Sequence, residues 1–82
     1  MKLEQNLVRS ISETEHLKQF VSRYDVMYDD HEIFIYIKEI SNTETQYDVD
    51  DEIESIEEKI GFAITLIDDT EAKKKKLGNP YP

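Results

Sequence analysis

The sequence contains no cysteine and no tryptophan, and only 2 glycines and 2 prolines occur among its 82 residues. Without cysteine the chain can form neither a disulfide nor a thiolate metal site, and it has no cysteine nucleophile. No apolar run reaches the roughly 18 residues that a membrane-spanning helix needs, and no signal-peptide pattern opens the chain. The length predicts one domain, and the lack of a long apolar run predicts that it has no membrane segment.

Sequence motifs of enzymes and of cofactor sites are also missing. There is no glycine-rich phosphate loop and no Gly-x-Ser-x-Gly turn, and the two histidines, His16 and His31, are isolated in the sequence. The acidic run 48–52 resembles the start of a calcium loop. However, Ile53 stands where that loop needs glycine, and Lys59 where it needs a bidentate glutamate. We therefore expect a protein that is not an enzyme and that binds neither a metal ion nor a cofactor.

Residues 2–11 fit two different structures. Their apolar side chains fit one face of a helix, because Leu3, Leu7 and Ile11 are four residues apart. Residues 7–11 alone could equally form a short strand. The pattern leaves both alternatives open.

A helix is predicted over residues 13–23. Ser12 and Glu15 have the spacing of a capping box, in which a hydroxyl caps the first turn and the glutamate three residues later reaches back. Apolar side chains then recur at the i, i+3, i+4 spacing of a buried helical stripe. They are Leu17, Phe20 and Val21.

Residues 24–40 predict a β-hairpin. Apolar residues alternate with others in the first arm, 24–28, and residues 29–31 supply the turn, because aspartate tolerates the backbone conformations of turns. The second arm, 33–37, is apolar on both faces at its middle, which is typical of a central strand. A polar loop is predicted over residues 41–46.

A second helix is predicted to begin near Asp48 and to end before Gly61, which is placed as the residue that closes a helix in the left-handed conformation. Its inward-facing positions follow the helical repeat. They are Ile53, Ile56 and Ile60. A strand is then predicted over residues 62–67, where apolar side chains occur on both faces.

These elements predict an α+β domain over residues 1–70, with two helices and a small, mainly antiparallel sheet. If residues 7–11 form a strand, the order of the elements is βαββαβ, the ferredoxin-like arrangement, which we favour. If these residues form a helix, the order is αββαβ. Residues 71–82, which include Lys73–Lys76, are predicted to be a disordered basic tail. A domain of this size buries only about 60% of the surface of its unfolded chain, so we expect that a homodimer would add to its stability by burying more.

Acidic side chains are concentrated in the middle of the chain. The net charge is −9, but from Asp25 to Glu58 there are 13 acidic residues and a single basic one, Lys38, which gives −12. Projected at about 100° per residue, the second helix places five carboxylates within about 120° of one another, away from its isoleucines. They are Asp50, Asp51, Glu54, Glu57 and Glu58. Such a face can simply keep a protein soluble.

Closely spaced carboxylates can also imitate the phosphate charges of duplex DNA. A protein that binds DNA mainly through lysine and arginine would accept such a surface in place of DNA. The predicted partner-binding residues lie in the hairpin and the second helix. They are Asp25, Asp29, Asp30, Glu32, Asp48, Asp50, Asp51, Glu54, Glu57 and Glu58.

In its small size, its lack of cysteine and its acidic stretch from Asp25 to Glu58, the chain resembles the small acidic proteins that bacteriophages encode, some of which mimic DNA. The resemblance implies a non-enzymatic inhibitor of a basic DNA-binding protein, for example a histone-like nucleoid protein, in the cytoplasm of a bacterial host. It implies no direct contact with nucleic acid or membrane. The basic residues Lys73–Lys76 depart from a purely acidic mimic.

The alternative is a protein–protein adaptor or antitoxin-like module. It would act through an exposed sheet edge and through the aromatic side chains Tyr24, Tyr28 and Tyr36.

Overall fold

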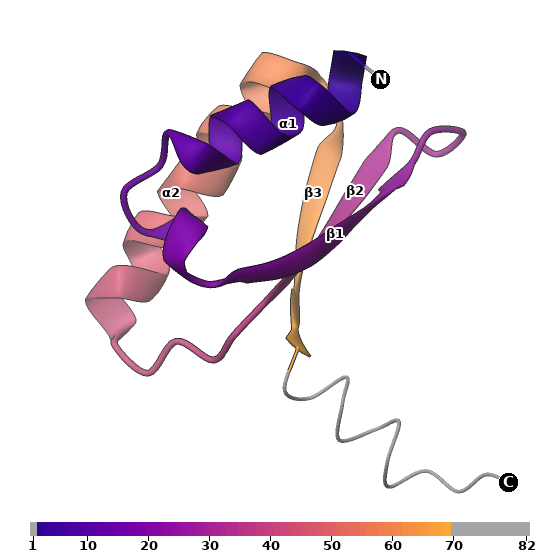
Figure 1. Cartoon of the computed structure of the whole chain (residues 1–82). Helices are drawn as coiled ribbons and strands as arrows, with labels where there is room; N and C mark the ends of the chain where they lie inside the picture. The colour runs from indigo at the N-terminus through magenta and orange to yellow at the C-terminus, as the bar shows by residue number, and fades with distance from the viewer. Residues whose placement is uncertain (1, 70–82) are drawn as a thin grey trace, which may run out of the picture.

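The computed structural model describes residues 2–69, which form two α-helices, a short 3₁₀ turn and three strands (Figure 1). In chain order these are α1 (Lys2–Ser12), η1 (Leu17–Gln19), β1 (Val21–Met27), β2 (Glu32–Ile37), α2 (Thr43–Ile60) and β3 (Ala63–Asp68). The predicted α+β class is confirmed. The predicted tail, residues 71–82, lies outside the described residues.

The sheet has the strand order β1-β2-β3, and both helices lie on one of its faces (Figure 1). β1 and β2 pair antiparallel, whereas β2 and β3 pair parallel, so the sheet is mixed and the prediction of a mainly antiparallel sheet is wrong. The parallel pair arises because α2 crosses over the sheet between β2 and β3, which is how a chain joins two parallel neighbours. The prediction that β2 is the central strand is confirmed.

The hydrophobic core lies between the helices and the sheet. Its fully buried side chains come from both helices, from η1 and from β2. They are Leu7, Leu17, Ile33, Ile35 and Val49, each 0% exposed. The three isoleucines of β2, at positions 33, 35 and 37, all point toward the helices, since side chains two residues apart in a strand share a face.

α1 decides the ambiguity of residues 2–11 in favour of a helix, so the topology is αββαβ and the ferredoxin-like order that we favoured is wrong. The predicted helix over residues 13–23 is also wrong. Ser12 is the last residue of α1, and its hydroxyl donates to the Arg9 carbonyl at 2.7 Å. Leu17 is buried as the first residue of η1, and Val21 is the first residue of β1, where it pairs with Ile37 of β2. The long-range pairing of the hairpin therefore overrides the local helical spacing.

α2 begins earlier than predicted, because Asn42 caps it. The Asn42 side-chain oxygen accepts the backbone N–H groups of Glu44 at 2.8 Å and Thr45 at 3.1 Å. Residues 43–46 are thus the first turn of the helix, and the predicted polar loop over them and the predicted start near Asp48 are wrong. The end of the helix is confirmed, since Gly61 adopts φ 86°, a conformation that glycine tolerates best.

Within residues 2–69, no helix is both long and apolar enough to cross a membrane.

Candidate functional site

The candidate site is the solvent-facing side of α2. Val49, Ile53 and Ile56 bury the opposite side of the helix in the core. The exposed carboxylates on the outer side form what we call the acidic stripe, which consists of Glu44, Asp50, Asp51, Glu54 and Glu58. It includes four of the predicted site residues and adds Glu44, which the prediction had assigned to a loop.

The acidic stripe runs along nearly the whole of α2, which is about 27 Å long at about 1.5 Å per residue. Asp51, Glu54 and Glu58 follow one another at spacings of three and four residues, which places neighbouring side chains about 5–6 Å apart. In residues 2–69 none of the stripe carboxylates forms an ion pair. The aromatic ring of Tyr47, which is 65% exposed, lies on the same side of the helix.

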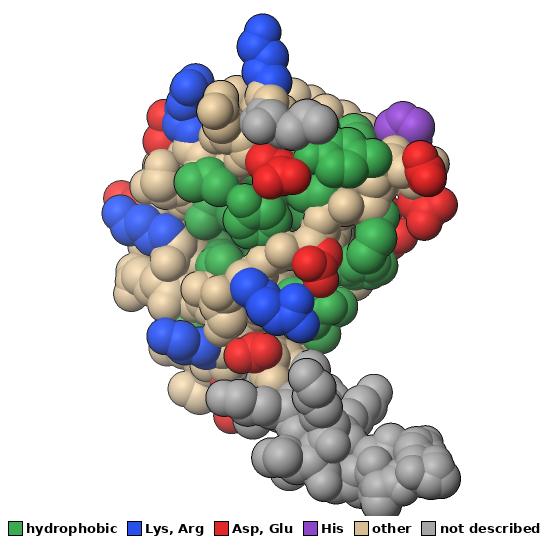
Figure 2. Space-filling view, turned by 45° about the vertical axis from the view of Figure 1, so that its right-hand side comes forward, with side chains coloured by type: hydrophobic (Ala, Val, Ile, Leu, Met, Phe, Trp, Pro, Cys, Tyr) green, Lys and Arg blue, Asp and Glu red, His purple; other side chains and the backbone are tan. Residues whose placement is uncertain are grey.

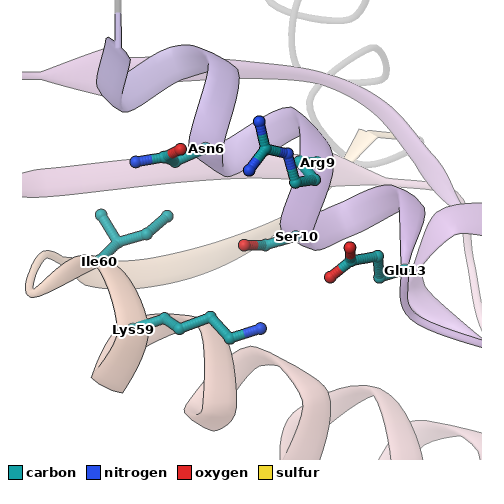
Figure 3. Close-up of a pocket in the computed structure, with 6 residues that line it drawn as sticks. All are labelled: Asn6, Arg9, Ser10, Glu13, Lys59 and Ile60. Carbon is teal, nitrogen blue, oxygen red and sulfur yellow. The ribbon is translucent and has the colours of Figure 1, made fainter.

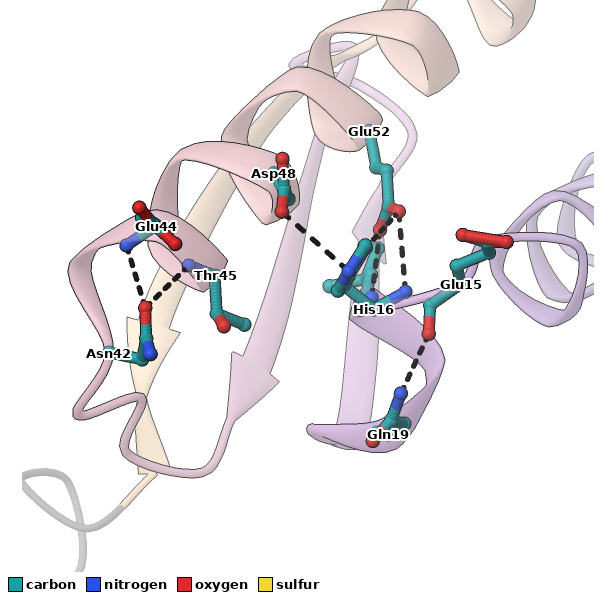
Figure 4. Close-up of polar contacts among 9 residues, drawn as sticks. Glu15, His16, Gln19, Asn42, Glu44, Thr45, Asp48 and Glu52 are labelled. Atoms are coloured by element: carbon teal, nitrogen blue, oxygen red, sulfur yellow. Dashed lines mark hydrogen bonds and ion pairs between the residues drawn. The ribbon is translucent and has the colours of Figure 1, made fainter.

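Asp48 and Glu52 face a different neighbour, the segment between α1 and η1 (Figure 4). Glu52 Oε1 accepts the backbone N–H of Leu17 at 2.8 Å, and its Oε2 accepts the N–H of His16 at 3.2 Å. The His16 ring places Nδ1 3.0 Å from Glu52 Oε2 and Nε2 3.6 Å from Asp48 Oδ2. Asp48 is thus partly occupied within the chain, and Glu52 ties the start of η1 to α2.

These contacts shift two ionisation equilibria in opposite directions. The pKa of His16 is raised, mainly by the hydrogen bond to Glu52; desolvation opposes this effect, and the negative charges of Asp48, Glu52 and Glu15 add to it. Partial burial tends to raise the pKa of Glu52, but the hydrogen bonds from His16 and from the backbone of Leu17 lower it below its usual value. Both shifts favour the charged forms of the pair.

Glu57 does not belong to the acidic stripe, although the helical projection placed it there. Its Oε2 accepts the backbone N–H of Ile64 at 2.8 Å, and the residue is half-buried. The carboxylate therefore fixes the start of β3 against α2, because it satisfies a backbone donor at the helix–strand junction.

The acidic residues of the hairpin are divided between two places. Asp25 pairs with Phe34 in the sheet and lies, with Glu32, on the face that the helices leave uncovered, so both point away from the acidic stripe. Asp29 and Asp30 lie in the turn between β1 and β2. His31 in that turn packs its ring 5.1 Å from Phe62, just after the end of α2. The turn thus lies near the C-terminal end of the acidic stripe.

A groove of about 320 Å³ separates α1 from α2 on another side of the molecule (Figure 3). Arg9 and Lys59 line it together with Glu13 and the buried residue Ser10. Neither Arg9 nor Lys59 forms an ion pair within the described residues. Two of the few basic side chains therefore gather between the helices and not among the carboxylates of the stripe.

Comparison of the chain with protein-family models, with curated proteins and with solved structures found no match. In residues 2–69 no three His, Asp or Glu side chains are grouped in a way that could hold a metal ion. The arrangement of charge on α2 is therefore the main basis for an inference about function.

Proposed function

We propose that this chain is a non-enzymatic binding protein that presents the acidic stripe to a basic DNA-binding protein and so competes with DNA. The partner class that fits best is a bacterial protein that holds the DNA backbone through lysine and arginine, such as a histone-like nucleoid protein. Inhibition would follow from occupation of the DNA-binding surface.

The observation that carries the proposal is the absence of lysine and arginine among the carboxylates of the acidic stripe, since Lys59 in the last turn is the one basic residue of α2. No lysine or arginine occurs between Lys38 and Lys59, and the stripe carboxylates are exposed and without ion pairs in the described part of the chain. Like charges three and four residues apart destabilise a helix by a few tenths of a kcal/mol per pair, so this arrangement has a cost in stability. Binding to a basic surface would offset that cost.

The predicted binding mode has a defined dependence on salt. A basic protein that binds DNA releases counterions, and its affinity falls steeply as salt rises. A carboxylate surface that takes the place of DNA should show the same trend, and its charge should accelerate encounter with the partner.

A competition assay tests the proposal. A labelled DNA duplex is bound to a purified histone-like nucleoid protein, and fluorescence anisotropy reports its release when this chain is added at low salt. We expect release that weakens as salt is raised. A bacterial lysate passed over the immobilised chain and eluted with a salt gradient should yield basic DNA-binding proteins at moderate salt.

A pair of charge-matched variants shows whether the stripe is the binding site. The variant Glu54→Lys with Glu58→Lys should weaken competition about tenfold, because two attractive contacts become repulsive. The control Glu13→Lys with Glu39→Lys makes the same change in net charge at exposed positions outside the stripe and should weaken it far less. Equal losses in the two variants, or competition that resists high salt, would contradict the proposal. Glu57 is left unchanged because it holds Ile64.

The adaptor alternative rests on a different observation, namely that β1 is an edge strand. The aromatic side chains that we predicted for it are largely engaged within the chain. Tyr28 donates to Glu4 at 2.8 Å, the Tyr36 ring lies 3.7 Å from the Arg23 guanidinium, and Tyr24 packs against the core. Binding of a partner strand at this edge would depend little on salt, which separates it from DNA mimicry.

A further inference from the structure

The outer edge of β1 has an unusual combination of features for an edge strand. Within residues 2–69 no strand pairs with its outer side. Three of the four exposed large hydrophobic residues lie along or beside it, namely Val8 at 47%, Met27 at 38% and Tyr28 at 40% exposed. Figure 2, which brings the hairpin side of the molecule forward, shows hydrophobic side chains gathered there among charged ones. Unpaired edges of this kind are templates for another strand.

The sequence of β1 is self-complementary about its central residue. If two copies of β1 align antiparallel about a two-fold axis at Tyr24, then Arg23 of each copy stands opposite Asp25 of the other, and the two Tyr24 side chains stand opposite each other. Opposite charges and apolar pairs directly across two strands are the pairings that stabilise a sheet.

The geometry of a sheet permits few other registers. Residues directly opposite each other in a sheet point to the same face, so a symmetric antiparallel pair must have its axis at a residue. An axis at Arg23 would place two guanidinium groups together, and an axis at Asp25 two carboxylates. Only the axis at Tyr24 pairs Arg23 with Asp25 on both sides.

The two faces of the edge support the same arrangement. Arg23 and Asp25 lie on the uncovered face of the sheet, where they already form an ion pair of 3.1 Å within the strand. Tyr24 lies on the helix side and lines a groove together with α1 residues that include Val8. A second copy would therefore bring apolar contacts on the helix side and charge pairs on the other. The strand irregularity between Val21 and Arg23 leaves the central three residues in regular pairing with β2.

We propose that β1 is the interface of a homodimer, in which two copies pair antiparallel at Tyr24 and form one continuous six-stranded sheet. The partner is a second copy of this chain, and the proposal does not depend on the function of the acidic stripe. Because one strand and one helix edge make a small interface, we expect a dissociation constant of about 10–100 μM at moderate salt.

Mixing two oppositely charged variants tests this register. Arg23→Asp gives each copy two acids in the strand centre, and Asp25→Arg gives each copy two bases, so each variant should associate about tenfold more weakly than the unchanged chain. An equimolar mixture should recover association as a 1:1 heterodimer in sedimentation equilibrium and native mass spectrometry. The chain carrying both substitutions, Arg23→Asp with Asp25→Arg, should again self-associate, and circular dichroism checks that every variant is folded.

Three results would overturn the proposal. The first is that the unchanged chain stays monomeric at about 1 mM, which is well above the expected dissociation constant. The second is that the single variants associate as strongly as the unchanged chain. The third is that the mixture of the two folded single variants contains no heterodimer. The double exchange keeps the test valid if one single variant fails to fold, because it restores the complementary pair within a chain of unchanged composition.

Discussion

Replacement of Glu52 by alanine should destabilise the fold more than any comparable change on the exposed side of α2. The Glu52 carboxylate accepts three hydrogen bonds from two residues, the backbone N–H of Leu17, the backbone N–H of His16 and the His16 ring. Leu17 is fully buried, so its N–H would lose its acceptor in a place where water cannot readily replace it.

The size of the effect follows from those contacts. A hydrogen bond to a charged group contributes about 1.5–3 kcal/mol, and a buried donor without a partner costs about 1–3 kcal/mol. Because the Glu52 side chain keeps 20% of its surface exposed, we take the lower part of these ranges and expect Glu52→Ala to lower the free energy of unfolding by about 2–3 kcal/mol. For a domain of this size, that corresponds to a fall in Tm of about 10–20 °C.

Urea unfolding followed by circular dichroism measures this loss, with Glu54→Ala as the control. Glu54 lies two residues further along α2, is exposed and has no ion pair in the described chain, so its replacement should change the free energy of unfolding by less than about 0.5 kcal/mol. Glu52→Gln keeps an oxygen acceptor for Leu17 and should lie between the two. If Glu52→Ala were no more harmful than Glu54→Ala, the inferred tie between η1 and α2 would be refuted.

Three further predictions concern single contacts. The pKa of His16 is raised from 6.5 and that of Glu52 is lowered from 4.5, so both groups are charged at about pH 6 and their contact weakens as pH rises through the raised pKa of His16. In urea unfolding, the difference in stability between the unchanged chain and His16→Gln should therefore be larger near about pH 6 than near about pH 8. Glu57→Ala should cost about 1–2 kcal/mol, because the Ile64 N–H loses its acceptor, whereas Glu58→Ala should be nearly neutral by the same assay. Asn42→Ala should cost about 1 kcal/mol and increase amide hydrogen exchange in the first turn of α2; a change in neither would contradict its role as the cap.

The parts of the fold that the sequence predicted correctly are those fixed by local chemistry. β2 is identified by a run of apolar residues, and the end of α2 by Gly61, which adopts the left-handed conformation that a terminating glycine favours. The start of α2 was missed although two local signals exist. Val49 continues the isoleucine repeat one turn toward the N-terminus, and Asn42 is a favoured capping residue.

The errors arise where distant residues decide the structure. Ser12, Glu15 and Leu17 match a helix in isolation, but the acceptor for the Leu17 N–H is Glu52, 35 residues away. Likewise, no local pattern shows which face of the sheet the helices cover. For that reason the sequence could not show that Asp25 and Glu32 point away from the acidic stripe, or that Glu57 is engaged by β3.

The two proposed surfaces reinforce each other geometrically. A two-fold axis perpendicular to a sheet keeps each face on its own side, so pairing through β1 would place both copies of α2, and both acidic stripes, on the same side of the doubled sheet. α1 lies on the β1 side of each copy, so two α1 helices would separate the stripes; with neighbouring helices about 8–10 Å apart, the stripes would lie about 25–30 Å from each other. A dimeric DNA-binding protein could engage both at once, and the second contact would gain from a high effective concentration.

The monomeric variant Arg23→Asp, whose stripe is intact, should therefore compete with DNA less well than the unchanged chain at concentrations where the latter is dimeric, although its added negative charge alone would favour binding to a basic partner. Undiminished competition by that variant would show that each acidic stripe acts alone.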